Sequence, residues 1–154
     1  MNSFISDLHI HSRFSMATSK QLTVPHLCGW AMVKGINVLG TGDFTHPKWR
    51  QELRDNLVFD EETGFYRPTA SPEPVFPDLA SSPARPPYFC LQTEISSIYK
   101  RGGKVRKVHN LVFMPTLEDA DRFSEKLGQI GNINSDGRPI LGLDSADLLD
   151  LVLN

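Results

Sequence analysis

The sequence predicts an α/β fold for one domain, on three observations. Apolar segments typical of strands alternate with segments of helical periodicity over the first half of the chain, in the order strand, helix, strand, helix. The 154 residues, 40% of them hydrophobic, are enough to bury one core. Histidines and carboxylates fall at or just after the ends of the apolar segments, where sites assemble in α/β sheets and barrels.

The first half of the chain supplies this alternation. Residues 4–11 alternate loosely between apolar and polar side chains and predict a strand, which a polar loop follows. Thr23 can cap a helix that Gly35 ends. The segment INVLGTGDF predicts a buried strand that runs into a turn, and Pro47 opens a second helix. That helix is expected to carry an apolar stripe made of Trp49, Leu53 and Leu57.

The second half predicts hairpins and two further helices. The segment VFDEETGFYRP resembles a hairpin, and residues 68–87 form a proline-rich stretch without periodicity, which predicts a mobile insertion. Two apolar strands, YFCLQTEISSI and VRKVHNLVFM, are joined by the basic turn YKRGGK. Thr116 and Asp119 resemble a capping box that opens a helix, NSDGRP is typical of a turn, and SADLLDLVL predicts a last helix.

Charge and composition narrow the class of protein. The formal net charge of −2 gives the whole chain no general attraction for nucleic acid or anionic membrane. A local basic run fits either a solvated hairpin or a phosphate-binding surface, and it consists of Lys100, Arg101, Lys104, Arg106 and Lys107. No apolar run is long enough to span a membrane, no signal peptide is evident, and Cys28 and Cys90 lack metal-ligand spacing, so we expect a cytoplasmic protein.

The histidines and carboxylates at the strand ends predict a metal site. His9 and His11 stand at alternate positions, so both side chains would leave one face of a strand. The candidate groups come from separate elements and are His9, His11, Asp43, His46, Glu94 and His109. Imidazole with carboxylate suits zinc, manganese or iron and suits calcium poorly. Each group also fits an ordinary structural role, and it is their joint placement that favours a metal.

Four motifs, taken in order, resemble those of the polymerase and histidinol phosphatase (PHP) superfamily: DLHIHS, GTGDFTHP, a strand ending in TE, and HN on the next strand. Longer segments resemble the endonuclease Q family of that superfamily: DLHIHSRFSMATSK, GTGDFTHPKW, LQTEISSIYKRGGKVRKVHNLVF and SDGRPILGLD. The resemblance implies the N-terminal part of a distorted βα barrel. It also implies a phosphodiesterase with two or three divalent ions (Zn, Mn or Mg) per complete site, which nicks damaged DNA 5′ to deaminated bases or abasic sites.

The resemblance also implies roles for particular residues. It makes His9 and His11 ligands of a first metal, Glu94 a carboxylate that bridges two metals, and His109 a ligand of the second. The second motif departs from the superfamily pattern, in which Asp and His are usually adjacent, so Asp43 and His46 are both catalytic candidates and either could face a third metal. Phosphate charge would be neutralised by cations from two segments, namely Arg13, Lys104, Arg106 and Lys107.

The motifs that the family carries on its later strands are missing from this sequence. We therefore expect residues 1–154 to be the N-terminal portion of a PHP phosphoesterase domain, and a portion that is inactive alone. Two other functions fit the same motifs. The first is a small-molecule phosphomonoesterase of the histidinol-phosphate phosphatase type, which needs no extended basic surface. The second is a non-catalytic PHP module with a binding or structural role.

Overall fold

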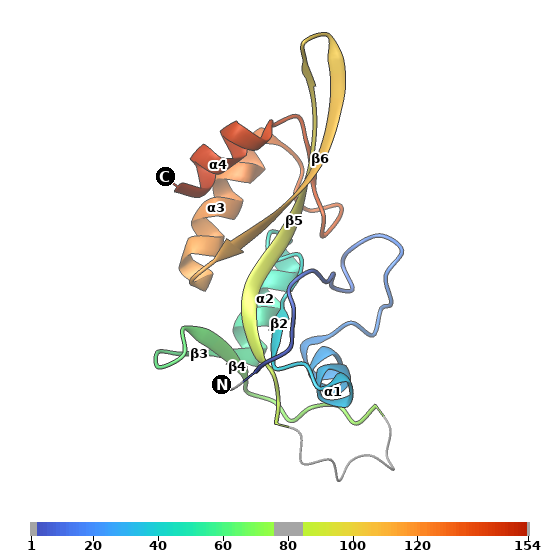
Figure 1. Cartoon of the computed structure of the whole chain (residues 1–154), viewed down its shortest axis with the longest axis vertical. Helices are drawn as coiled ribbons and strands as arrows, with labels where there is room; N and C mark the ends of the chain where they lie inside the picture. Colours follow the sequence, from blue (N-terminus) through green and yellow to red (C-terminus); the bar gives the residue numbers. More distant parts are fainter. Residues whose placement is uncertain (1–2, 76–84, 154) are drawn as a thin grey trace.

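The computed structural model describes residues 3–75 and 85–153, and this part of the chain has a mixed α/β fold (Figure 1). The predicted α/β class is therefore confirmed. The elements are β1 (Ser6–Asp7), α1 (Val24–Lys34), β2 (Val38–Gly40), α2 (Pro47–Asn56), β3 (Leu57–Asp60), β4 (Phe65–Pro68), β5 (Tyr88–Arg101), β6 (Lys104–Met114), α3 (Leu117–Ile130), β7 (Ile140–Leu141) and α4 (Ser145–Leu153). None of the helices in these two ranges is long and apolar enough to cross a membrane.

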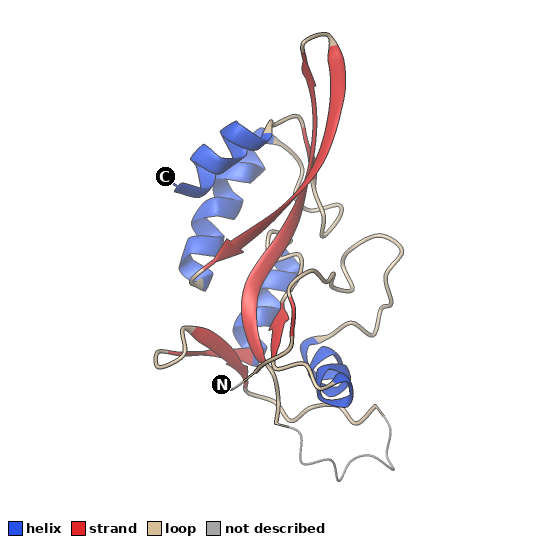
Figure 2. Ribbon diagram, viewed as in Figure 1, coloured by secondary structure: helices blue, strands red, loops and turns tan. Residues whose placement is uncertain are grey.

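Strand β5 is the spine of the sheet. Its first residues pair in parallel with β2 and in antiparallel with β4, which gives the order β1-β2-β5-β4-β3. From Leu91 to Arg101 it pairs in antiparallel with β6, and at Ser96 and Ser97 it pairs in parallel with β7. Among the described strands the sheet is open, and the β5–β6 hairpin extends well beyond the rest of the molecule (Figure 2).

The helices begin and end where local capping chemistry allows. The Thr23 side chain accepts a hydrogen bond from the His26 N–H at the start of α1, and Gly35 ends that helix in the left-handed conformation with φ of 70°. The Thr116 side chain accepts from the Asp119 N–H at the start of α3. Both predicted caps are confirmed.

Two predicted boundaries in the first half were wrong. The strand expected over residues 4–11 pairs with β2 only at Ser6 and Asp7, so His9 and His11 lie beyond the last paired residue. Leu57 begins β3 with an extended backbone instead of continuing α2. Leu57 is nevertheless buried together with Trp49 and Leu53, so the apolar side chains of the predicted stripe do form one buried group.

The hairpin after residue 88 is longer than its apolar segments predicted. The basic residues expected in a loop belong to the strands, and only Gly102 and Gly103 form the turn, with φ of 60° and 73°. Two successive residues with positive φ are what a tight two-residue hairpin turn requires. Glu94, expected at a strand end, therefore lies within β5. Strand β7 was not predicted, because Ile140–Leu141 is too short to show periodicity.

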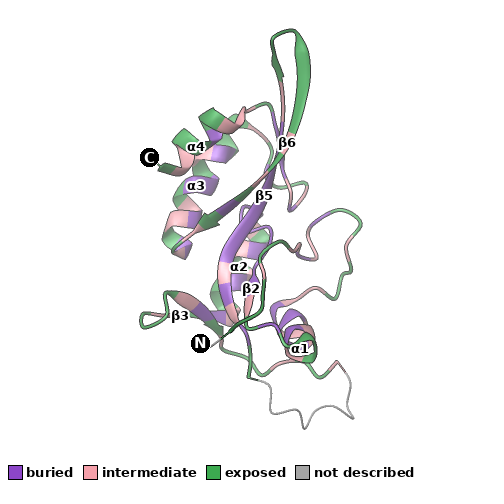
Figure 3. Ribbon diagram, viewed as in Figure 1, coloured by how far each residue is buried: buried purple, intermediate pink, exposed green. Residues whose placement is uncertain are grey.

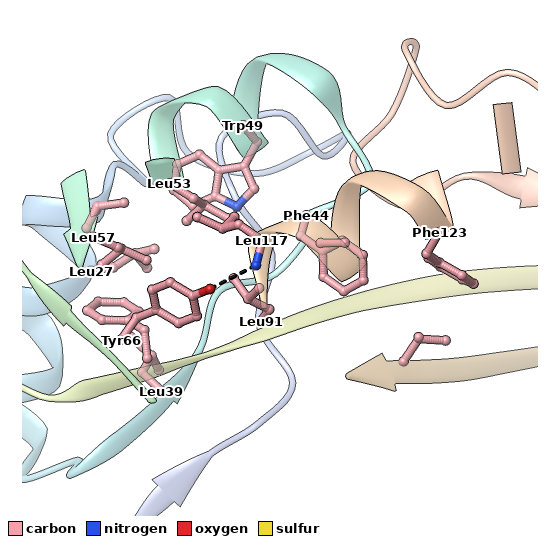
Figure 4. Packing of buried hydrophobic residues seen from close by; sticks show 14 of the residues in the cluster. Leu27, Leu39, Phe44, Trp49, Leu53, Leu57, Tyr66, Leu91, Leu117 and Phe123 are labelled. Carbon is pink, nitrogen blue, oxygen red and sulfur yellow. Dashed lines mark hydrogen bonds between the residues drawn. The ribbon is translucent and has the colours of Figure 1, made fainter. Parts of the chain in front are cut away.

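The core lies between the sheet and the helices, and most of β5 is buried in it (Figure 3). Figure 4 shows the packing of Trp49 and Leu53 of α2 near Phe44, with the Tyr66 hydroxyl accepting the Leu117 N–H at 2.8 Å. The Trp49 indole N–H donates to the Gly42 carbonyl at 2.8 Å and thereby ties α2 to the loop after β2. The core thus fixes the loop from which Asp43 projects.

Residues 76–84 of the predicted insertion, 68–87, lie outside the described residues. The part before them is attached to the fold. The Thr69 N–H donates to the Asn56 carbonyl at 2.9 Å, and the Glu73 N–H donates to the Pro25 carbonyl at 3.0 Å. The first residues after β4 are therefore bonded to the end of α2 and to the first turn of α1.

An apolar hollow of about 650 Å³ opens beside β1 and β6. Its walls include Phe4, Leu8, Cys90, Leu91, Phe113 and Met114. Leu111 and Phe113 are both partly exposed, and they alternate with His109 along one face of β6. Apolar surface therefore continues along the face of β6 that carries His109.

We expect Tyr66→Phe to lower the free energy of unfolding by about 1–3 kcal/mol, because it leaves the buried N–H of Leu117 without its acceptor. Tyr99→Phe, near the exposed end of the hairpin, is the matched control and should change it by less than about 0.5 kcal/mol. Urea denaturation followed by circular dichroism measures both. Equal losses in the two variants would contradict the role of the Tyr66 hydroxyl.

Candidate metal centre

Three histidines converge on the carboxylate of Glu94. This side chain is only 1% exposed, and its Oε2 lies 3.0 Å from His9 Nε2 and 3.1 Å from His11 Nε2. Its Oε1 lies against His109 Nδ1. The structure thus brings together all four residues predicted as metal ligands, with His9 and His11 at one oxygen and His109 at the other.

The register of the β5–β6 hairpin places His109 beside Glu94. Glu94 pairs with Leu111 and Ser96 pairs with His109, so all four side chains leave the same face of the hairpin. His109 is a diagonal neighbour of Glu94, a separation within reach of long side chains. The contact therefore follows from strand pairing alone.

Gly42 lets the His9–His11 segment lie against the loop after β2. Its φ is +66°, and a Cβ there would lie 2.7 Å from the Ile10 carbonyl oxygen and 3.0 Å from the His11 Cα. A side chain at this position would both strain the backbone and push the segment away. Gly42 is therefore required for the position of His11.

Asp43 holds His11 from the other side of the ring. Asp43 is fully buried, and its Oδ1 lies 3.0 Å from His11 Nδ1. Its Oδ2 accepts hydrogen bonds from the Ser12 N–H at 2.6 Å and from the hydroxyls of Ser12 and Ser15. Both carboxylate oxygens are thus engaged, and Asp43 orients the imidazole whose Nε2 reaches Glu94.

The electrostatics differ between His11 and His46. The hydrogen bond with Asp43 raises the pKa of His11, with burial opposing it and the charges of Asp43 and Glu94 adding to it. Burial lowers the pKa of His46, whose Nε2 lies 3.1 Å from the Asn134 carbonyl oxygen and whose ring stacks on Phe14. His46 thus packs on the Phe14 side of the site, at the N-cap position of α2, where its side chain makes no capping hydrogen bond.

The expected phosphate-binding residues separate into different places. Lys107 pairs with Ile98 and shares the hairpin face of Glu94 and His109, whereas Lys104 and Arg106 alternate to the opposite face. Arg101, which pairs with Lys104, forms an ion pair with Asp144 just before α4, at 3.2 Å. That opposite face is thus turned toward α4.

The remaining predicted groups are engaged elsewhere. The Arg13 guanidinium donates to Glu52 Oε2 at 2.7 Å, so its charge is already paired. His26, which the sequence placed in the first turn of a helix, accepts a hydrogen bond from the Trp30 indole and lies outside the group of potential ligands.

Sequence reasoning could not place one cation of the basic run, Lys100, and missed a second cation beside the site. Lys100 and Lys107 leave the same face of the hairpin, and only the pairing register of β5 and β6 shows this. Arg138 has its Nη1 3.9 Å from Glu94 Oε2. The NSDGRP sequence predicted a turn, and SDGRPILGLD belonged to the resemblance, but no role was assigned to Arg138. A cation within a segment of that resemblance was the signal that could have identified it.

The donor set fits a divalent transition metal. Ligand atoms of His9, His11 and Glu94 lie within 4.8 Å of one another. Glu94 Oε1 is buried and, in the part of the chain that the structure describes, accepts no well-directed hydrogen bond. The His9 and His109 side chains are 51% and 53% exposed, so the group is open to solvent on one side. Imidazole nitrogen, carboxylate oxygen and an open side are what a catalytic zinc or manganese site requires.

A scan against models of known protein families finds no match. Among solved structures, the chain is similar to endonucleases that act on damaged DNA, with a TM-score of 0.72 and 32% identity. One is the lesion-specific endonuclease PfuEndoQ from Pyrococcus furiosus, and the other is endonuclease Q in complex with a 27-mer duplex substrate that has an abasic lesion at the active site. The similarity to endonuclease Q expected from the motifs is confirmed.

The extent of these similarities is uneven. Each covers 96% of this chain but only 31% of PfuEndoQ and 32% of the chain in the DNA complex. An uncharacterized protein of Methanocaldococcus jannaschii is 30% identical over 147 residues, which are 95% of this chain and 14% of that protein. The chain thus spans about a third of the endonuclease Q chains that it matches.

Gly42→Ala should weaken Mn²⁺ binding by about 10-fold or more, because the added Cβ displaces the His11 segment. Gly64→Ala is the matched control, since Gly64 also has positive φ (+72°) but nothing within 4 Å of the added Cβ. Isothermal titration calorimetry measures both affinities. Equal weakening in the two variants would show that backbone strain, and not the approach to His11, is responsible.

The pKa of His11 in the metal-free chain should lie above 6.5 and fall in Asp43→Asn, because Asp43 is the main cause of the increase. Since the folded pKa is raised, His11 contributes stability that is complete below the unfolded pKa and lost as the pH rises through the folded pKa. Metal affinity should change in the opposite sense and fall as His11 becomes protonated. NMR titration of the imidazole checks the shift. An unchanged pKa in Asp43→Asn would contradict the role of Asp43.

Proposed function

We propose that this chain carries part of the active site of a metal-dependent DNA repair endonuclease of the endonuclease Q type. The proposal depends on one observation. Glu94 Oε2 contacts His9 and His11, whereas Glu94 Oε1 contacts His109. A carboxylate with imidazoles at both oxygens suits a pair of neighbouring cations. In this proposal the described fold is the N-terminal portion of a distorted βα barrel.

The proposed ligands follow from the geometry. His9, His11 and Glu94 would hold one ion, and His109 together with Glu94 would contribute to a second. A bound Zn²⁺, Mn²⁺ or Mg²⁺ ion would supply Lewis acidity, which activates water at neutral pH and stabilises negative charge on the phosphoryl oxygens.

The other residues orient these ligands. Asp43 fixes the ring of His11 through Nδ1, so that Nε2 faces Glu94. His46 packs on Phe14 and holds the Asn134 carbonyl, which anchors the loop after α3. In this proposal Asp43 and His46, the two catalytic candidates of the sequence, act as positioning residues.

The proposed substrate is the backbone of damaged DNA, cut 5′ to a deaminated base or an abasic site. Two observations support it. The complex of endonuclease Q holds a duplex with an abasic lesion at the active site. In this chain, Lys100 and Lys107 stand on the hairpin face of Glu94 and His109, so cations continue outward from the metal centre. A monophosphate ester of a small molecule would need no such extension.

The test is metal-dependent nicking by the protein expressed from its complete reading frame. Duplexes with uracil, hypoxanthine or an abasic site are compared with undamaged duplex and with histidinol phosphate, each with Mn²⁺, Mg²⁺ or Zn²⁺. Nicking of a damaged duplex that His9→Ala and Glu94→Ala both abolish is the expected result. Turnover of histidinol phosphate alone would instead establish a phosphomonoesterase, and metal binding without any turnover would establish a non-catalytic module.

Cations on the hairpin face that carries Glu94 and His109 are the ones that we expect to contact DNA. Replacing Lys100 and Lys107 with alanine should weaken binding to every duplex alike and reduce the slope of log K against log salt by about 0.9 for each lost phosphate contact. The matched control replaces Lys104 and Arg106, which carry the same charge on the opposite face, and should change the slope less. Fluorescence anisotropy over a range of salt concentrations measures both. If replacing Lys104 and Arg106 reduced the salt slope more, the opposite face of the hairpin would be the one that contacts DNA.

A further inference from the structure

We propose that Arg138 is a phosphate-binding residue of this site, and that its guanidinium contacts a non-bridging oxygen of the phosphate group bound beside Glu94. The inference rests on the proposed function and gives a role to Arg138, which lies in the SDGRPILGLD segment but was not among the predicted site residues. Its basis is a cation at the edge of the metal centre, 3.9 Å from Glu94 Oε2, whose guanidinium makes no hydrogen bond to the described part of the chain.

The loop before β7 is docked against the metal-site residues. The Gly137 N–H donates to the Phe14 carbonyl at 3.0 Å. A Cβ at Gly137 would lie 2.4 Å from the Asp43 carboxylate carbon and 2.7 Å from the Ser15 hydroxyl, so only glycine allows this approach. The Asp136 carboxylate accepts the Met16 N–H at 3.2 Å. The loop thus packs against Asp43 and Ser15, which surround the His11 ring.

The backbone of Arg138 is held on both sides. Its N–H donates to the Asp136 carboxylate at 3.1 Å. The next residue, Pro139, accepts the Ser96 N–H at 3.0 Å, and Ile140 then pairs with Ser96 in the β5–β7 ladder. Ser96 is two residues from Glu94 on β5 and leaves the same face of that strand. The position of Arg138 next to Glu94 is therefore set by strand pairing and by the docked loop.

The guanidinium of Arg138 has free donors. Arg138 Nη1 lies 3.9 Å from Glu94 Oε2, which is close enough for an ion pair but too far for a hydrogen bond. The side chain is 40% exposed. In residues 3–75 and 85–153, no side-chain hydrogen bond of Arg138 is observed, whereas Arg13 is bonded to Glu52 and Arg50 to Asp121. Arginine presents five donors in a planar fork that matches phosphate oxygens. Arg138 is thus a partly exposed charged donor beside Glu94, and its guanidinium has no hydrogen-bond acceptor among the described residues.

A purely structural role for Arg138 makes a different prediction. If the arginine only balanced the buried charge of Glu94, its removal would change metal binding and leave the binding of an anion to the loaded site unchanged. A phosphate-binding role predicts the reverse. The two roles are separated by measuring Mn²⁺ affinity and inorganic phosphate affinity in the same variants.

The experiment titrates inorganic phosphate into the Mn²⁺-loaded protein by calorimetry and repeats it with Arg138→Ala and Arg138→Lys. Arg138→Ala should weaken phosphate binding by about 10-fold or more and change Mn²⁺ affinity by less than about 3-fold. Arg138→Lys should recover part of the loss, because it keeps the charge without the planar fork. Arg122→Ala, at an exposed arginine of α3, is the matched control and should leave phosphate affinity unchanged.

The outcomes separate the inference from the proposed function. Wild-type protein that binds neither Mn²⁺ nor phosphate would overturn the proposed function. Wild-type protein that binds both, with phosphate affinity unchanged in Arg138→Ala, would overturn only the role of Arg138. Loss of Mn²⁺ binding in Arg138→Ala would likewise overturn it in favour of charge balance. Where damaged DNA is nicked, Arg138→Ala should also raise KM and lower kcat, while nicking by Arg122→Ala stays at the wild-type level.

Discussion

The burial of the Glu94 carboxylate is the constraint on which the rest of the site depends. An ionised group that is 1% exposed is costly unless charges or hydrogen bonds compensate it. The chain brings positive or proton-bearing groups to it from several segments: His9 and His11 from the segment after β1, His109 from β6 and Arg138 from the loop before β7. The same surroundings suit a divalent cation, which satisfies a buried carboxylate more completely than neutral imidazole does.

Strand β5 makes this convergence possible, because both halves of the fold pair with it. Its first residues belong to the sheet with β2 and β4, and its later residues form ladders with β6 and β7. Glu94 lies in the β6 ladder, between the residues that pair with β2 and those that pair with β7, so the loop after β2, the hairpin and the loop before β7 all reach it. Gly42 and Gly137 then let two of these loops approach more closely than a residue with a side chain would allow.

Much of this could be predicted from the sequence, and the remainder depends on pairing that local patterns do not contain. The caps at Thr23 and Thr116 are local chemistry, and the motifs were sufficient to group His9 with Glu94. The face of each hairpin cation depends instead on the length of the turn, since shifting the pairing by one residue moves every side chain to the other face. The basic run therefore did not reveal that Lys107 and Lys104 point in opposite directions. The contact between Arg138 and Glu94 similarly requires β7, which is too short to be recognised from its residues.

The proposed function requires Glu94 to lie between metal ions held by different histidines. Crystals grown with Mn²⁺ and measured at the manganese absorption edge test it most directly, because anomalous scattering locates each ion independently of the protein atoms. We expect one peak beside His9, His11 and Glu94 Oε2, and another beside His109 and Glu94 Oε1. Protein that binds manganese elsewhere, with no peak at either oxygen of Glu94, would contradict it.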